Sequence, residues 1–436
     1  MEQEISKMII IKFENINNIF IFLNLILIIL LMSCSTERND EFYDHTNLPK
    51  NLSNSIIYKT LNNEVNIYTD SNHHSILISD TNTKYYWPTI TDDNEYIAYS
   101  YVSELSTEYQ IGIDLLDIDK NTKSEIYSTK SSTKNLLSNN IPHYMTWAPN
   151  SNILSFATPT ENYPALYIYK HTNTNYEKLV DFGPLWINWN ADKLSVHRRD
   201  KRFVYKINDS ISNLVDTTNV SMYYRIDPWI NSDELLSIFQ DFNIVTIVKS
   251  NISTEISEIL FNVNQYSMLN ISPNKKYLSI LSSDTYPTSV YDSLALYDLE
   301  LNQIVFQTTD SPIGYFWSPD SSKVLIISTT NEPSNYNVNL LNVNNYEITK
   351  VQTMQFTSEQ LEMFIFADQF ANSHKLWSHD SSEILIAGSI EFSNIESEDQ
   401  IVTPKYNIFK ISDLDTKPVM KKLFPGLIGY WTNLQK

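Results

Sequence analysis

The stretch Trp317-Ser318-Pro319-Asp320-Ser321-Ser322-Lys323-Val324-Leu325-Ile326 decides the fold of this chain. It joins an aromatic residue, a polar turn with Pro and Asp, and a short apolar segment. Pro fixes φ at the start of a tight turn, and an Asp side chain accepts hydrogen bonds from backbone N–H groups ahead of it. The stretch therefore predicts the end of one strand, a short turn and a second strand.

The same pattern recurs along the chain at intervals of 40 to 60 residues. Close copies begin at Trp377 and Trp147, and weaker ones begin at Ile90, Trp189, Trp229, Ile271 and Trp431. Each unit divides into four short strands; around the first stretch these are expected at 313–317, 323–329, 337–343 and 347–354. A long repeat of four strands is typical of a β-propeller, so the sequence predicts an all-β fold.

These repeats resemble the WSPDG repeats of TolB-like, WD-type β-propellers, over nearly all of the chain after Ser53. The resemblance implies a structural role for the motif tryptophans and partners among envelope proteins. The family has Gly after the Asp, whereas this chain has Ser321 and Ser381. The turn must then avoid positive φ or carry strain. The motif tryptophans are Trp147, Trp189, Trp229, Trp317, Trp377 and Trp431.

The two ends of the repeat region predict how the ring closes. Three strands without a Trp motif are expected at 55–60, 64–69 and 75–79, and the last unit supplies only the strand at 429–432. Joining them completes one blade and hides two sheet edges that would otherwise invite aggregation. This count of strands predicts eight four-stranded blades, with seven blades as the alternative if two weak units merge.

The N-terminus predicts export and lipid attachment. Lys7 and Lys12 precede the apolar run 16–32, a combination typical of a secretory signal. Leu31-Met32-Ser33-Cys34 resembles the bacterial lipobox, which implies that Cys34 is acylated after removal of residues 1–33. We expect a signal peptide at 1–33, the lipidated Cys and a flexible tether at 34–52, and the propeller at 53–436. An uncleaved membrane anchor is the alternative.

Composition excludes several classes of protein. The chain has 436 residues, of which only six are Gly, and no Gly-rich nucleotide-binding motif or nucleophile elbow can be built from those positions. The net charge of −20 argues against nucleic acid as a partner, because proteins that bind it carry basic stripes. The eight His show no metal-ligand spacing, so we expect neither a metal nor a cofactor.

Loop lengths predict which face of the propeller carries function. The motif turns are short, whereas the longer segments fall on the opposite face, where functional loops gather. We expect the binding site at that long-loop mouth. The longer segments are 102–108, 158–164, 283–292, 331–335, 391–405 and the insertion 357–372.

Two groups of residues are candidates for this site. Arg198, Arg199 and Arg225 form a basic island in an acidic chain, suited to a carboxylate or phosphate; local ion pairs with Asp192, Asp200 and Asp227 are the alternative. The apolar insertion is expected to include a short helix. It resembles a segment of other bacterial propellers, which implies that Asp368, Gln369 and His374 lie near the channel mouth. A structural role for His374 is the alternative.

These observations predict a lipid-anchored extracytoplasmic β-propeller, periplasmic or at the cell surface, that acts as a binding or scaffolding module in the bacterial cell envelope. The expected partners are membrane lipid through the acylated Cys34 and an envelope protein or glycan. No catalytic residue is assigned. The alternative is a propeller enzyme, a glycan hydrolase or lyase with its site at the long-loop mouth.

Overall fold

The computed structural model divides the chain into two compact units, Met1–Asp44 and His45–Lys436. It describes residues 52–69, 73–78, 83–105, 108–131, 141–159, 164–181, 183, 185–285, 289–390 and 405–433. All of these belong to the second unit. The predicted signal peptide 1–33, Cys34 and nearly all of the predicted tether 34–52 lie outside the described residues.

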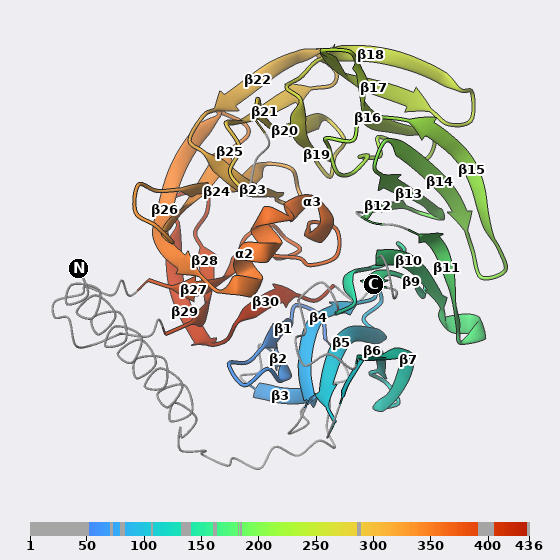
Figure 1. The fold of residues 1–436 in the computed structure, drawn as a ribbon. Helices are drawn as coiled ribbons and strands as arrows, with labels where there is room; N and C mark the ends of the chain where they lie inside the picture. Colours follow the sequence, from blue (N-terminus) through green and yellow to red (C-terminus); the bar gives the residue numbers. More distant parts are fainter. Residues whose placement is uncertain are drawn as a thin grey trace, which may run out of the picture. The chain divides into compact units, whose positions relative to one another are not determined.

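The second unit is built from antiparallel sheets that follow one another in chain order around a ring (Figure 1). Most contain four strands, and the apolar positions of their inner strands are buried. The first three sheets wholly contiguous in the chain are β4(Thr83–Ile90) β5(Tyr96–Glu104) β6(Tyr109–Asp117) β7(Thr122–Ser131), β8(His143–Trp147) β9(Ile153–Pro159) β10(Pro164–Lys170) β11(Asn175–Asp181), and β12(Leu185–Asn190) β13(Lys193–Arg198) β14(Lys201–Ile207) β15(Ser212–Asn219).

The later sheets depart from four strands at two places. A three-stranded sheet lacks a regular inner strand; there, Trp229 forms only an isolated bridge to Leu235. A seven-stranded sheet joins two repeat units through a short pairing of Gln355 with Ser389. These sheets are β16(Glu234–Asp241) β17(Ile244–Asn251) β18(Ile256–Asn262), β19(Tyr266–Ile271) β20(Tyr277–Ser283) β21(Ser293–Asp298) β22(Gln303–Thr308), and β23(Pro312–Trp317) β24(Lys323–Thr329) β25(Tyr336–Asn342) β26(Glu347–Phe356) β27(Ile384–Ser389) β28(Asn407–Ser412) β29(Val419–Pro425).

One sheet combines strands from both ends of the repeat region and confirms the predicted closure. Its order is β3-β2-β1-β30, from β1(Ile56–Lys59), β2(Val65–Thr69), β3(His73–Ile78) and β30(Ile428–Trp431). The register places Ile56 opposite Trp431. Thr432 extends the pairing by donating its N–H to the Ser55 carbonyl oxygen at 2.9 Å. The all-β propeller is therefore as predicted, whereas the number of blades stays a prediction.

The sequence left two possibilities for the motif turns, a turn without positive φ or a strained one. The turns at Ser321 and Ser381 adopt the strained one. Ser321 and Ser381 have φ of 63° and 62°, in the left-handed region that favours Gly. Each serine hydroxyl accepts a hydrogen bond from the motif turn of the preceding unit: Asn274 N–H donates to Ser321 Oγ, and Asp320 N–H donates to Ser381 Oγ, both at 3.0 Å. The side chain that causes the strain thus also links neighbouring turns.

The motif tryptophans join neighbouring repeat units. Trp317 in β23 donates its indole N–H to Ser279 Oγ in β20 at 3.0 Å, and Trp189 in β12 donates to Ser155 Oγ in β9 at 2.8 Å. Trp377 donates in the same way to the carbonyl oxygen of Phe316 at 3.1 Å. All three indoles are buried. Each indole packs against the preceding repeat unit and its N–H finds a partner there, which fixes the spacing of successive units.

An insertion after β26 lies on the inner side of the ring (Figure 1). It forms α2(Ser358–Ile365), as expected, and α3(Ala367–Phe370). Thr357 caps α2 by accepting the Gln360 N–H on its side chain. Gly314 in β23 permits close packing of α2, because a Cβ at that position would lie 2.1 Å from the Phe364 carbonyl oxygen. We call residues 357–374 the plug.

Candidate functional site

The long-loop mouth brings the predicted arginines to one corner of the ring. Arg198 ends β13 and pairs with Leu185 at the start of β12, so it lies level with the entry of that inner strand. His197 ties this corner together: its Nδ1 lies 2.7 Å from the Arg225 carbonyl oxygen, and its Nε2 lies 2.8 Å from that of Arg199. The backbones of the three arginines therefore converge, as the sequence predicted.

Arg225 is held against the plug by contacts of two kinds. Its Nη1 donates to the Ile365 carbonyl oxygen at 2.6 Å and lies 3.4 Å from Asp368 Oδ1. Its guanidinium also lies over two aromatic rings, 4.7 Å from the Phe366 centroid and 5.2 Å from that of Trp186. Both hydrogen bonds use Nη1, so Nε and Nη2 have no hydrogen-bond partner among the described residues. The side chain is 18% exposed.

The side chain of Asp368, which was expected near the mouth, is fully covered. Burial raises the pKa of its carboxyl, and Arg225 offsets this only in part. The second carboxyl oxygen, Oδ2, has no hydrogen-bond partner among the described residues. Asp227, one of the three aspartates in the alternative of local ion pairs, does not pair with Arg225; its Oδ1 accepts from the Tyr224 hydroxyl at 2.6 Å. The ion pair of this corner thus crosses from the ring to the plug.

Gln369 and His374 are buried contacts of the plug with the channel lining. Gln369 exchanges two hydrogen bonds of 3.1 Å with the backbone of Ile187 in β12. His374 Nδ1 lies 2.7 Å from Ser373 Oγ, and its ring packs edge-on against Tyr430 at 4.7 Å. Burial lowers the pKa of His374 to about 3, so the ring is neutral at physiological pH. The described contacts of His374 fit a structural role; a binding role for either residue stays a prediction.

Sequence reasoning missed Glu362, an acidic residue of α2. It interacts electrostatically with Tyr144 in β8, and burial together with Glu359 raises its pKa to about 7. A single carboxylate inside the apolar run Leu361–Phe366 was the available signal, since an isolated charge is rarely placed there without a function.

The aromatic lining around the plug also had a signal in the sequence. The chain contains eight Trp, and two of them, Trp87 and Trp186, do not start a motif turn. Both face the plug: Trp87 stacks on Phe370 at 4.6 Å, and Trp186 stacks on Phe366 at 6.0 Å. Tryptophans outside the repeat pattern therefore marked the channel lining.

Two of the lining residues adopt strained backbone conformations. Trp87 and Tyr144 have φ of 49° and 51°, and each lies at an irregularity in the register of its inner strand. Their rings lie 4.6 and 5.8 Å from that of Phe370. Such strain persists only where the surrounding packing imposes it, and it is common at functional sites.

The described residues contain no group of three His, Cys, Asp or Glu that could hold a metal ion. No helix within the described ranges is both long and apolar enough to cross a membrane.

The strand order and closure define the protein as a β-propeller, here with a plug packed against its inner strands. No protein-family model matches the chain, and no curated protein is similar to it in sequence. A solved eukaryotic initiation factor has the same fold, with a TM-score of 0.51, 10% identity, and coverage of 87% of this chain and 98% of that one.

Two further solved structures are more distant in shape. TolB from Acinetobacter baumannii has a TM-score of 0.38 at 12% identity, covering 78% of this chain and 83% of its own. The β-propeller domain of the Trilobed protease from Pyrococcus furiosus has a TM-score of 0.47 at 11% identity, and the match covers 78% of this chain and 97% of that one. At these identities the similarity concerns the fold alone.

Proposed function

We propose that this protein is a lipid-anchored binding module of the bacterial cell envelope, and that its partner binds at the long-loop mouth around Arg225. The observation that carries this proposal is the state of the Arg225 guanidinium. Two rings and the plug hold it in place, yet Nε and Nη2 have no partner among the described residues. A partner that presents a carboxylate or phosphate can occupy those donors.

The composition of the mouth supports the same role. Trp, Tyr and Arg dominate the energetics of protein interfaces, and Trp186, Tyr144 and Arg225 meet here, each partly exposed. Arg199 is exposed at the same corner and makes no ion pair with another described residue. In an acidic protein such a corner attracts an anionic partner.

The location in the envelope rests on the N-terminal sequence. The apolar run, the lipobox-like Leu31–Cys34 and the single cysteine together support export followed by acylation. The acyl chains would hold the propeller at a membrane surface, and the polar stretch after Cys34 would give it reach.

The test is affinity capture from native envelopes with the anchored protein, repeated with Arg199→Ala and Trp186→Leu. Both variants should lose the captured partner while their melting temperatures stay close to the wild-type value. The control is Lys421→Ala with Lys422→Ala, which removes two exposed cations from the outer strand β29. Capture by the wild type should weaken with salt. Equal capture by all variants would exclude the mouth as the binding surface.

A second candidate, a glycan hydrolase, is favoured by one observation. Glu362 has a pKa of about 7, so at neutral pH much of it is protonated, as a general acid must be. Glu359, one helical turn away, forms an ion pair with Lys59 at 3.0 Å. Release of reducing ends from purified peptidoglycan that disappears in Glu362→Gln would establish the enzyme; no release by the wild type at pH 5–8 would exclude it for this substrate.

A further inference from the structure

One face of helix α2 points from the plug toward the blades. Glu359, Glu362 and Phe366 follow one another at intervals of three and four residues, which is the spacing of one helical face. Contacts at both ends settle where this face points. Glu359 pairs with Lys59 at the end of β1 at 3.0 Å, and the Phe366 ring lies 5.9 Å from that of Tyr144 in β8. Glu362 lies between these two contacts and therefore faces the blades as well.

Glu362 is partly buried there without a cation. Its carboxyl forms no ion pair or hydrogen bond with another described residue, whereas Glu359 has Lys59. Burial, and then repulsion by Glu359, raise the pKa of Glu362 to about 7. The helix nevertheless fixes its position, because Phe366 N–H donates to the Glu362 carbonyl oxygen at 3.0 Å. A cation beside this carboxyl would offset the repulsion and favour its charged form.

Three aromatic rings next to Glu362 form a partly exposed apolar surface. The ring centroids of Tyr144, Trp186 and Phe366 lie 5.9 to 6.0 Å from one another, and each residue is partly exposed. Burial raises the pKa of the Tyr144 hydroxyl; Arg225 then lowers it, whereas Glu362 raises it. This surface therefore lies near charges of both signs.

Arg225 supplies the positive charge beside these rings. Its guanidinium lies 4.7 Å from the Phe366 centroid, and its Nε and Nη2 have no partner among the described residues. One helical turn, about 5.4 Å of rise, separates Phe366 from Glu362. The mouth thus presents a carboxyl and a guanidinium on either side of an aromatic ring, and each of them can accept a further partner.

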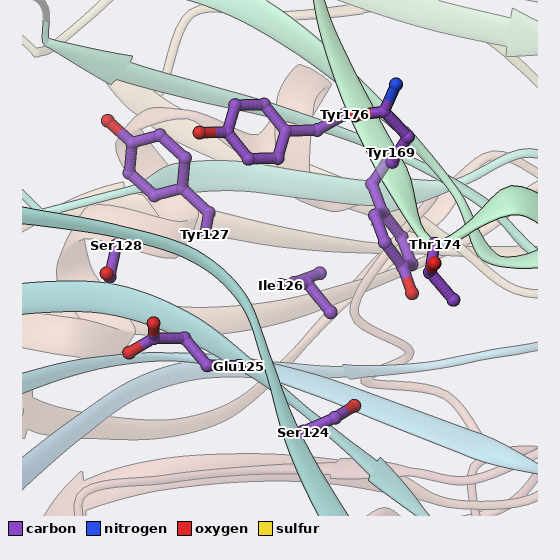
Figure 2. A pocket seen from close by; sticks show the side chains of 9 residues that line it. Ser124, Glu125, Ile126, Tyr127, Ser128, Tyr169, Thr174 and Tyr176 are labelled. Atoms are coloured by element: carbon purple, nitrogen blue, oxygen red, sulfur yellow. The ribbon is translucent and has the colours of Figure 1, made fainter.

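The tyrosine-lined hollow between β7 and the hairpin of β10 and β11 lacks this arrangement. It measures about 380 Å³, but the rings of Tyr127 and Tyr169 at its base are buried. Figure 2 shows the Glu125 carboxylate on the opposite side of β7 from the Tyr127 ring. The described residues that line the hollow include no Lys or Arg. Exposed rings and charges of both signs meet at the mouth and not in this hollow.

We propose that the mouth binds a lysine-type zwitterion, in which a chain of methylene groups separates an ammonium group from a free carboxylate. The ammonium lies against Glu362, and the carboxylate takes the free donors of Arg225. The methylene groups lie on the aromatic surface, whose π-faces also attract the ammonium. A ligand with adjacent charges, such as glycine, cannot reach both groups across the Phe366 ring. This inference rests on the proposed function, because it assigns chemistry to the ligand of the same site.

Calorimetric titration of the full-length protein in a nonionic detergent tests the inference with ligands that differ by one charge. Nα-acetyl-lysine carries both charges, its Nε-acetylated form lacks the cation, and its amide lacks the anion. The first should bind at least about tenfold more tightly than either of the others. Equal binding of Nα-acetyl-lysine and the Nε-acetylated form would overturn the cation site and leave the anion site of the proposed function intact. Absence of Nα-acetyl-lysine binding at millimolar concentration would overturn the inference outright.

One variant and its matched control locate the cation. Glu362→Gln keeps the shape and removes the charge, so it should weaken Nα-acetyl-lysine binding at least about tenfold and leave the Nε-acetylated form unaffected. Glu255→Gln removes an exposed carboxylate from the turn between β17 and β18, away from the mouth, and should change neither. Melting temperatures verify that both variants are folded. Unchanged Nα-acetyl-lysine binding by a folded Glu362→Gln would overturn the inference.

A lysine-type zwitterion can come from a protein C-terminus or from a small molecule, so peptides distinguish the two sources. Tighter binding of a short peptide that ends in lysine than of Nα-acetyl-lysine would assign the site to a C-terminus; equal binding would assign it to the single residue. The same peptide with a C-terminal amide should bind at least about tenfold more weakly in either case. Arg199→Ala should leave these titrations unchanged while it abolishes envelope capture, so this inference and the proposed function can fail separately.

Discussion

Asn94 and Asn433 hold each other across the closure of the ring. Asn94 donates its side-chain amide to the Asn433 carbonyl oxygen at 2.8 Å, and Asn433 N–H donates to Asn94 Oδ1 at 3.0 Å. The side chain of Asn433 also donates to the Thr91 carbonyl oxygen at 2.9 Å. Both asparagines are buried. The motif turn that follows β4 is thereby fastened to the residues that follow β30.

Replacing Asn94 with Ala should destabilise the propeller by about 2–4 kcal/mol, because two buried backbone groups of Asn433 lose their partners and Ala tolerates positive φ less well than Asn. Asn94 has φ of 61°. Denaturant unfolding measures the effect. Asn302→Ala is the matched control, since Asn302 also has positive φ, 53°, but is exposed. Equal losses in the two variants would show that the closure bonds contribute nothing.

The stabilities of the Ser321 variants should follow an unusual order, with Gly more stable than Ala. Ser321→Ala keeps the strain of positive φ and loses the hydrogen bond from Asn274 N–H, so it should cost about 1–2 kcal/mol. Ser321→Gly loses the same bond but relieves the strain, so it should lie within about 1 kcal/mol of wild type. Thermal unfolding of the three proteins gives the order. A Gly variant less stable than the Ala variant would contradict this account.

Trp317 should behave as a buried contact between sheets. Trp317→Ala should destabilise the fold by about 3–5 kcal/mol through the cavity that it creates. Trp317→Phe keeps most of the packing and loses the bond to Ser279, so about 1–2 kcal/mol is expected. A melting temperature unchanged by Trp317→Ala would mean that the stability of the propeller does not depend on the packing of Trp317.

The repeat could be read from the sequence because its signal is local. Trp, Pro and Asp within four residues of Trp317 set the turn and the strands around it, and repetition along the chain then implies a ring. The closure followed from counting strands, since the first unit has only three strands, β1 to β3, and β30 has no partner within its own repeat unit. Arg225 was found because arginine is scarce in the chain.

The plug could not be placed from the sequence in the same way. Its position depends on pairs far apart in the chain, such as Gln369 with Ile187 and Phe364 with Gly314. No local pattern encodes such contacts.

In the proposed function, membrane attachment depends on Cys34. Cys34→Ser should move the protein from the membrane fraction to the soluble extracytoplasmic fraction, because the acyl chains provide the anchoring energy. Mass spectrometry of the wild-type protein should find an acylated Cys34 as the first residue. An unmodified Cys34, or a protein that retains residues 1–33, would contradict the prediction.

Glu362 should make the stability of the propeller depend on pH between about 4.5 and 7. Burial raises its pKa from the usual 4.5 to about 7, so the folded state keeps a proton that the unfolded state releases. The contribution of this group is therefore full below pH 4.5, falls as the pH rises, and is constant above about 7.

Glu362→Gln removes the ionisation, so the variant should match wild type at pH 4.5 and exceed it at pH 8 by about 1–2 kcal/mol, a value reduced from the full linkage energy because the side chain is partly exposed. Denaturant unfolding from pH 4.5 to 8 measures the difference. Glu359→Gln is the contrasting control: it breaks the ion pair with Lys59, so it should destabilise the protein at neutral pH. A difference between Glu362→Gln and wild type that does not change with pH would mean that the carboxyl ionises normally in the folded protein, which would also remove the main support for a general acid at this site.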